Sequence, residues 1–104
     1  MWAIDSDLVE EWLVSLDEDS YTQVIAALRI VESDGPALGR PLVDTIKASR
    51  HRNMKELRPG SSGRSEVRIL FAFDPRRRAI LLVAGDKRGQ WQKWYRQNIP
   101  IADA

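Results

Sequence analysis

The stretch EVRILFAFDPRRRAILLVA, residues 66–84, carries the strongest structural signal in the chain. Its first part places apolar residues at every second position: Val67, Ile69, Phe71 and Phe73. This two-residue period is typical of a β-strand with one buried face. The turn-forming residues 74–78 (Asp-Pro-Arg-Arg-Arg) follow, and the apolar run 79–84 has the length of a strand buried on both faces. The stretch therefore predicts a central β-hairpin.

Further strands are predicted on the N-terminal side of this hairpin. Residues 54–58 have strand character and are separated from the hairpin by the flexible turn 59–63 (Pro-Gly-Ser-Ser-Gly), which together predict a three-stranded meander. Residues 36–53 contain prolines and a glycine, so we expect an ordered loop with one brief strand around Val43. Residues 1–5 predict a short opening strand.

Three segments have the spacing of helices. Residues 8–16 and 21–31 each place their apolar side chains on one stripe, and Gly35-Pro36 is expected to end the second helix. Residues 90–98, with Tyr95 among them, predict a final helix that stops before Pro100. The pattern predicts an α+β fold in which an N-terminal strand and a helical hairpin pack on one face of a small, mostly antiparallel sheet. The other face would carry basic residues.

Composition narrows the class of protein. A length of 104 residues with 43 % hydrophobic residues fits a single domain, residues 1–104. Cysteine is absent, so no disulfide framework or thiolate metal site is expected, and we expect no cofactor. Acidic residues near the N-terminus and the lack of a long apolar run argue against export and membrane insertion, and favour the cytoplasm.

The charges are distributed unevenly along the chain. The net charge is only +1, but residues 1–46 have a balance of −8 and residues 47–104 a balance of +9. Such asymmetry indicates that the basic part binds a polyanion. The candidate contact residues are Arg50, Arg52, Arg58, Arg64, Arg88 and Lys93. A solvated basic surface without a function would have the same composition.

Four side chains are candidates for chemistry: Arg68, Lys87, Lys55 and Tyr95. Arg68 shares a strand face with apolar residues, where a guanidinium needs an anionic partner, a functional reason or a structural salt bridge to Glu56 or Glu66. Lys87 follows the last strand on a turn, where sites are common. Lys55 and Arg58 have opposite parity, so one of them faces the Arg68 surface. Tyr95 offers a phenol, although it is equally suited to packing.

These residue types fit RNA cleavage without a metal. A 2′-hydroxyl attacks the adjacent phosphate, a base accepts its proton, an acid protonates the 5′-oxygen, and cations stabilise the phosphorane. Arginine and lysine supply positive charge directly. Lysine and tyrosine can transfer protons only if burial or neighbouring cations lower their pKa values toward neutrality.

Four motifs carry a resemblance to a known family. They are LGRP (38–41), MKELR (54–58), VRILFAFD (67–74) and ILLVAGDK (80–87). Their order and spacing, over nearly the whole chain, resemble the phage-derived, HigB-like branch of the RelE/ParE toxin superfamily. Many RelE-like nucleases have a histidine or tyrosine close to the last strand, whereas here Tyr95 stands several residues further on.

The resemblance implies a toxin that cleaves messenger RNA in the ribosomal decoding site. By position, Arg68 would stabilise the phosphate, Lys87 would be the basic residue after the last strand, and Lys55 and Arg58 would hold RNA or the ribosome. The family also implies a cognate antitoxin with a helix-turn-helix DNA-binding domain, so that DNA contact is indirect. Two alternatives stay open: a ParE-like gyrase inhibitor, and a non-catalytic RNA-binding member.

Overall fold

A computed structural model describes residues 1–46, 54–59, 67–86 and 91–103 of the chain. In these ranges the elements run β1 (Ala3–Asp5), α1 (Glu10–Val14), α2 (Glu18–Asp34), β2 (Val43–Thr45), β3 (Met54–Leu57), β4 (Val67–Phe73), β5 (Arg78–Asp86) and α3 (Trp91–Asp103). Short 3₁₀ turns precede α1 and follow α2. The predicted α+β fold is confirmed.

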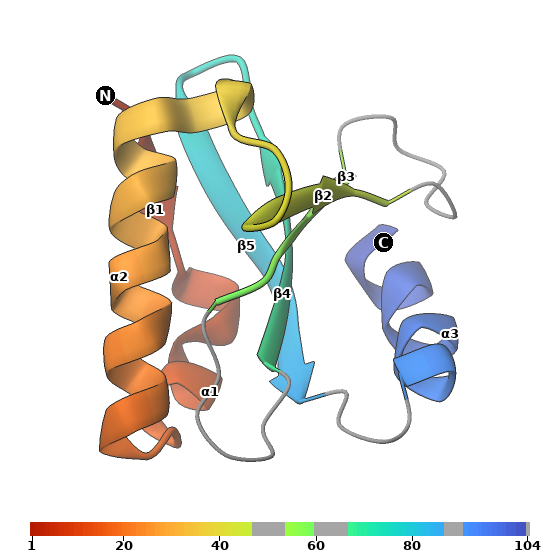
Figure 1. Cartoon of the computed structure of the whole chain (residues 1–104). Coiled ribbons are helices and arrows are strands. Elements are labelled where there is room, and N and C mark those ends of the chain that lie inside the picture. Colours follow the sequence, from red (N-terminus) through yellow and green to blue (C-terminus); the bar gives the residue numbers. More distant parts are fainter. Residues whose placement is uncertain (47–53, 60–66, 87–90, 104) are drawn as a thin grey trace.

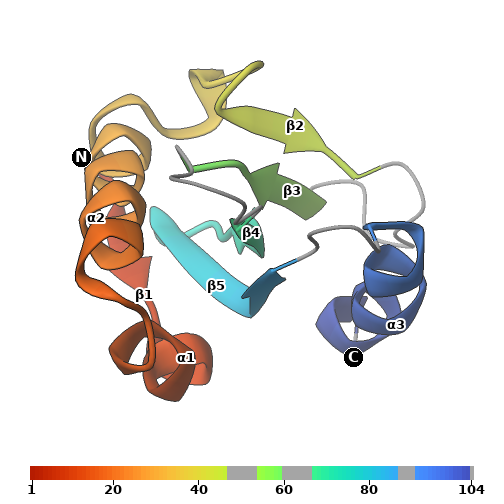
Figure 2. The same ribbon diagram turned by 60° about the horizontal axis from the view of Figure 1, so that its bottom comes forward.

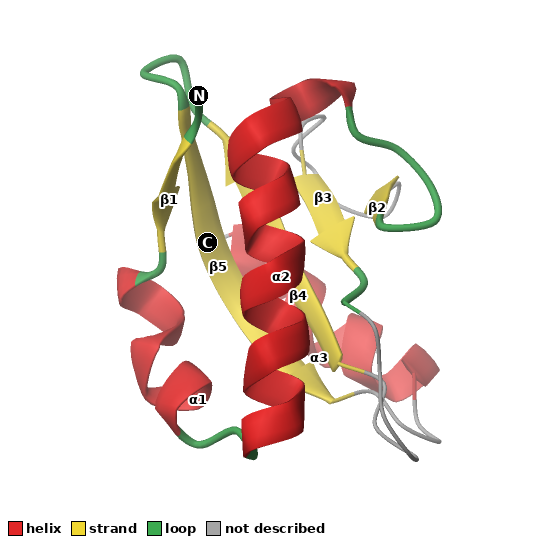
Figure 3. Cartoon of the chain, turned by 60° about the vertical axis from the view of Figure 1, so that its left-hand side comes forward, coloured by secondary structure: helices red, strands yellow, loops and turns green. Residues whose placement is uncertain are grey.

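The strands form one sheet in the order β1-β5-β4-β3-β2. β3, β4 and β5 make the predicted antiparallel meander, β2 adds antiparallel to β3, and β1 adds parallel to β5. Helices α1 and α2 cover one side of the sheet, and α3 lies on the opposite side (Figures 1 and 2). In Figure 3 the long helix α2 runs across the strands. We call the two sides the hairpin face and the α3 face.

Helix α2 begins and ends where local chemistry allows it. The Asp17 carboxylate accepts a hydrogen bond from the Ser20 amide at 3.2 Å, which satisfies one of the free amides of the first turn. Gly35 ends the helix with φ +61°, a backbone conformation that favours glycine. The Trp2 indole packs directly against Gly35, where a side chain would otherwise point. The strand β1 is thereby fixed beside the end of α2.

The turn between β4 and β5 also follows from its sequence. The Asp74 carboxylate accepts hydrogen bonds from the amides of Arg76 and Arg78 at 3.0 and 2.9 Å. Arg77, at φ +61°, completes the reversal, and its guanidinium lies 4.8 Å from the centre of the Trp2 ring. The aspartate at the first turn position therefore stabilises the hairpin, because its carboxylate accepts hydrogen bonds from backbone amides of the turn, as aspartates in turns commonly do.

The main core lies between the sheet and the helical hairpin. Ile69, Phe71 and Leu81 are completely buried there against Val24 and Leu28 of α2, among other residues. This confirms the predicted apolar side of β4. The expectation that residues 79–84 are buried on both faces is wrong: Ala79 and Leu81 are buried, but the neighbouring side chains are only partly covered, because α3 spans part of the α3 face.

Helix α3 differs from its predicted end. It continues through Pro100 to Asp103 instead of stopping at residue 98. Proline removes one backbone hydrogen bond but does not forbid a helix when packing compensates. Here Ile99 and Ala102 are buried against Met54 and Leu70 of the sheet, forming a second, smaller core. Burial of the last turn therefore outweighs the local preference, and it fixes α3 on the sheet.

Candidate functional site

A cluster of charged and phenolic side chains occupies the α3 face. Alternation along β3 and the pairing of Glu56 with Leu70 bring Glu56, Arg58 and Arg68 to this face, and α3 adds Tyr95 beside them. Three elements that are distant in sequence thus contribute to one cluster. We call it the Glu56 cluster.

Glu56 lies at the centre of this cluster and is completely buried. Its Oε1 atom lies 2.9 Å from Arg58 Nε and 4.0 Å from Arg68 Nε. The carboxylate also shares a hydrogen bond with the Tyr95 side chain. Its second oxygen, Oε2, is buried without a hydrogen-bond partner among the described residues. A buried carboxylate requires such compensating cations and donors, because removing a charge from water is costly.

Arg58 is held between two carboxylates. Its Nε donates to Glu56, and its Nη2 lies 3.1 Å from Asp44 Oδ2. The hydrogen bond to Glu56 raises the pKa of Arg58 further above its ordinary value. Asp44 also binds the exposed Arg40 at 3.0 Å, and this contact, with that of Arg58, lowers the Asp44 pKa. Arg58 is therefore committed to protein carboxylates.

Arg68 has weaker partners than Arg58. Its Nη1 donates to the Val67 carbonyl at 2.7 Å, but its Nε is buried without a hydrogen-bond partner among the described residues. The 4.0 Å separation from Glu56 is too long for a hydrogen bond. Its side chain is 16 % exposed. Arg68 is therefore less neutralised than Arg58, and the exposed part of its guanidinium is well shaped to bind a phosphate.

Tyr95 reaches this cluster because α3 returns over the sheet. Its side chain is half-buried and packs against the smaller core of Met54, Leu70, Ile99 and Ala102. Burial, and then the hydrogen bond with Glu56, raise the pKa of Tyr95 well above that of an ordinary tyrosine. The expectation that its pKa is lowered toward neutrality is therefore wrong. The side chain remains a phenol at neutral pH, which can donate a hydrogen bond or a proton but is a weaker acid than an ordinary tyrosine.

The other predicted site residues fall elsewhere. Lys55 has the parity of Leu57 and lies on the opposite face from Arg68, where its Nζ donates to Thr45 Oγ1 at 3.0 Å. Of the two predicted cations, Arg58, which directly follows β3, shares the Arg68 face, and Lys55 does not. Lys93 is exposed on α3. The remaining predicted residues lie outside the described ranges: Arg50, Arg52, Arg64, Lys87 and Arg88.

Sequence reasoning did not assign Glu56 to the site, except as one possible salt-bridge partner of Arg68. The sequence offered one signal: Glu56 lies between Lys55 and Leu57 in a predicted strand. A carboxylate at that position must face one side of the sheet, and could therefore contact cations of the neighbouring strand. Its complete burial depends on α3 and on both arginines, which come from other parts of the chain. The centre of the cluster is therefore a product of tertiary structure.

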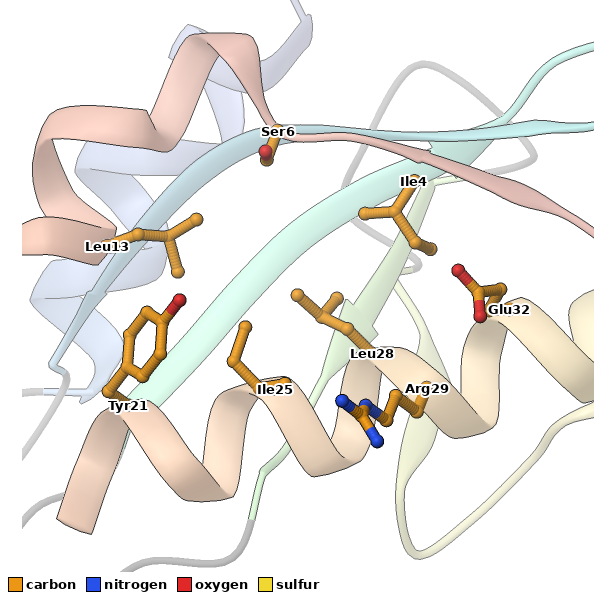
Figure 4. A pocket seen from close by; sticks show the side chains of 8 residues that line it. All are labelled: Ile4, Ser6, Leu13, Tyr21, Ile25, Leu28, Arg29 and Glu32. Atoms are coloured by element: carbon orange, nitrogen blue, oxygen red, sulfur yellow. The ribbon is translucent and has the colours of Figure 1, made fainter. Parts of the chain in front are cut away.

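A hollow lies on the hairpin face, between β1, α1 and α2 (Figure 4). It has a volume of about 590 Å³. Its walls combine apolar and polar side chains, and its charged lining residues are Arg29 and Glu32, which have opposite charges. This groove lacks the excess of cations that a polyanion requires. The α3 face is thus the better candidate for binding a nucleic acid.

The described ranges, 1–46, 54–59, 67–86 and 91–103, contain neither a metal site nor a membrane-spanning helix. No group of three or more histidine, cysteine, aspartate or glutamate side chains in these ranges is arranged to hold a metal ion. No helix in the described part of the chain is long and apolar enough to cross a membrane.

The fold and the Glu56 cluster define a small α+β protein with a candidate arginine-based anion site on one face of its sheet. The chain belongs to the family described as Phage derived protein Gp49-like (DUF891), whose model matches residues 11–104. The resemblance to the phage-derived, HigB-like branch is thereby confirmed.

Two proteins of Mycobacterium tuberculosis are similar to this chain. One, named "Putative toxin HigB2", is 59 % identical over 102 residues, which are 98 % of this chain and 51 % of that protein. The other, named "Putative toxin HigB3", is 53 % identical over 95 residues, which are 91 % of this chain and 81 % of that protein. The chain thus spans about half the length of the first relative. No solved structure matches the chain.

Proposed function

We propose that this protein is the toxin of a type II toxin–antitoxin system and that it cleaves messenger RNA on the ribosome. Membership of the Gp49-like family and the names of its two relatives support the toxin assignment. The observation that carries the cleavage proposal is Arg68, a largely buried arginine with an unused donor beside a phenol. Together they offer a cation for a phosphate and a proton donor.

The proposed reaction is the attack of an RNA 2′-hydroxyl on the adjacent phosphorus, with departure of the 5′-oxygen. Arg68 would stabilise the added negative charge on the phosphorane, where an aligned donor contributes most. Tyr95, kept protonated by its surroundings, would donate a proton to the departing 5′-oxygen. Lys87 is proposed to accept the proton of the attacking 2′-hydroxyl, for which it must be unprotonated. The predicted basic residues other than Arg58 are proposed as contacts to RNA or the ribosome, with Lys55 on the hairpin face facing the ribosome.

The test is primer extension on a defined message, with and without translating ribosomes. New 5′ ends are expected only with ribosomes and only from the parent chain, whereas Arg68→Ala should lose at least about a hundredfold in cleavage. Arg76→Ala is the matched control, because Arg76 is an exposed arginine of the β4–β5 turn. Growth arrest without any cleavage would refute the nuclease proposal and favour gyrase inhibition. RNA binding without arrest or cleavage would favour the non-catalytic alternative.

We also propose a cognate antitoxin as the partner, with a helix-turn-helix domain through which the complex contacts DNA. The two relatives named as toxins support this pairing. Co-expression of the neighbouring open reading frame should relieve growth arrest, and the two proteins should co-purify. An operator fragment should be shifted by the complex and not by this chain alone.

A further inference from the structure

Glu56 occupies an unusual position for a carboxylate. It is completely buried, yet it faces a cation at 2.9 Å, a second cation at 4.0 Å and the hydroxyl of Tyr95. A carboxylate needed only for stability would be expected to satisfy both of its oxygens. Here Oε2 and the nearby Arg68 Nε are both buried without a hydrogen-bond partner among the described residues.

We propose that Glu56 is a positioning residue that holds Arg68 and Tyr95 on the α3 face for an incoming phosphodiester. This inference rests on the proposed function, because it assigns a role within the same site. Glu56 itself is completely buried, so it does not touch the substrate. It acts through the two side chains that reach toward the surface.

The unequal spacing of the two arginines supports this role. Arg40, Asp44, Arg58, Glu56 and Arg68 form a row of alternating charges, with contacts of 3.0, 3.1, 2.9 and 4.0 Å along it. The last contact is the longest, so Arg68 is the cation that is least neutralised. Glu56 thus attracts the Arg68 guanidinium to a fixed place without occupying its Nε donor.

Glu56 has a second effect on Tyr95. The charged groups that face this phenol from the sheet are Glu56, Arg58 and Arg68. Glu56 is an acceptor that orients the hydroxyl. Its negative charge also opposes ionisation and makes Tyr95 a weaker acid, so Glu56 serves the proposed reaction by orienting the donor and not by raising its acidity.

The first test is a spectrophotometric titration of tyrosine. The chain has two tyrosines, so Tyr21→Phe isolates the signal of Tyr95. Tyr95 should resist ionisation well above pH 10.0, its ordinary value. Adding Glu56→Gln, which keeps the shape and removes the charge, should lower its midpoint by about one pH unit or more. An unchanged midpoint would overturn the proposal.

The matched control is Glu32→Gln. Glu32 is a partly buried carboxylate on the opposite, hairpin face. Its replacement should leave the Tyr95 titration unchanged. If Glu32→Gln shifted the titration as much as Glu56→Gln, the effect would be one of overall charge, and the proposal would be wrong.

The second test separates positioning from binding. In ribosome-dependent cleavage, Glu56→Gln should lower kcat about tenfold or more and change KM by less than about threefold, because orientation is lost while Arg68 remains. An unchanged kcat would contradict the proposal. If the parent chain does not cleave, the proposed function fails, whereas the titration still decides whether Glu56 holds Tyr95.

Circular dichroism establishes whether Glu56→Gln is folded. If it is not, Glu56→Asp replaces it, because aspartate keeps the charge but withdraws the carboxylate from Arg68 and Tyr95. A lower Tyr95 midpoint together with a lower kcat would then support the proposal, and values equal to those of the parent would overturn it, because burial alone already raises the Tyr95 pKa.

Discussion

Replacing Arg58 by alanine should reveal how much the buried carboxylate depends on its nearest cation. Arg58→Ala removes the 2.9 Å contact to Glu56 and the 3.1 Å contact to Asp44. Breaking a buried ion pair from one side typically costs about 3–5 kcal/mol. Arg58 is 34 % exposed, and Arg68 and Tyr95 stay near the carboxylate, so we expect a smaller loss of about 2 kcal/mol.

Arg40→Ala provides the matched control for this prediction. Arg40 also binds Asp44, at 3.0 Å, but its side chain is 74 % exposed and it does not reach Glu56. Exposed ion pairs contribute little, so its loss should be below about 1 kcal/mol. Urea denaturation measures both, and thermal melting should show a drop of about 10 °C for Arg58→Ala. Equal, small losses in the two variants would refute the reasoning that Arg58 compensates the buried charge.

Three further predictions concern other parts of the molecule. Gly35→Ala should lower the free energy of unfolding by about 2–3 kcal/mol in urea, because φ is +61° and the new Cβ would lie 2.6 Å from Trp2 Cδ1. Pro100→Ala should raise it by about 1 kcal/mol and increase the helical circular dichroism signal, since it restores an amide donor. Asp44→Asn should be less stable than the parent at neutral pH. The hydrogen bond from Arg40 lowers the pKa of Asp44 in the folded chain below 3.8, its ordinary value. The difference in unfolding free energy between the two chains should therefore shrink as the pH falls below 3.8, and vanish below the folded pKa of Asp44.

Much of the fold follows from local sequence patterns. The alternation in residues 67–73, the turn around Asp74 and the helix stop at Gly35 each depend on residues that are close in the chain. These elements are therefore determined by residues that are neighbours in the chain, through the two-residue period of a strand or the positive φ of a glycine. The brief strand expected around Val43, within a loop, is also present as β2.

The C-terminal helix shows where local reasoning fails. Pro100 was expected to end it, because proline lacks an amide and crowds the preceding turn. The helix continues since Ile99 and Ala102 are buried against Met54 and Leu70, residues from two other strands. That contact also determines where Tyr95 lies. The residues that extend the helix past the predicted end are thus the ones that hold it over the site.

The charge pattern illustrates a related limit. The excess of cations in residues 47–104 indicated a polyanion site, but a count of basic residues does not measure how many are free to bind. Arg58 was a predicted RNA contact, and it is occupied by Glu56 and Asp44. Arg68 is the less neutralised arginine of the cluster because its contact with Glu56 is longer by about an ångström. The capacity of this face to bind a phosphate therefore depends on which of its arginines the carboxylates neutralise. Glu56 neutralises Arg58 more than Arg68, and a count of charges in the sequence does not identify it.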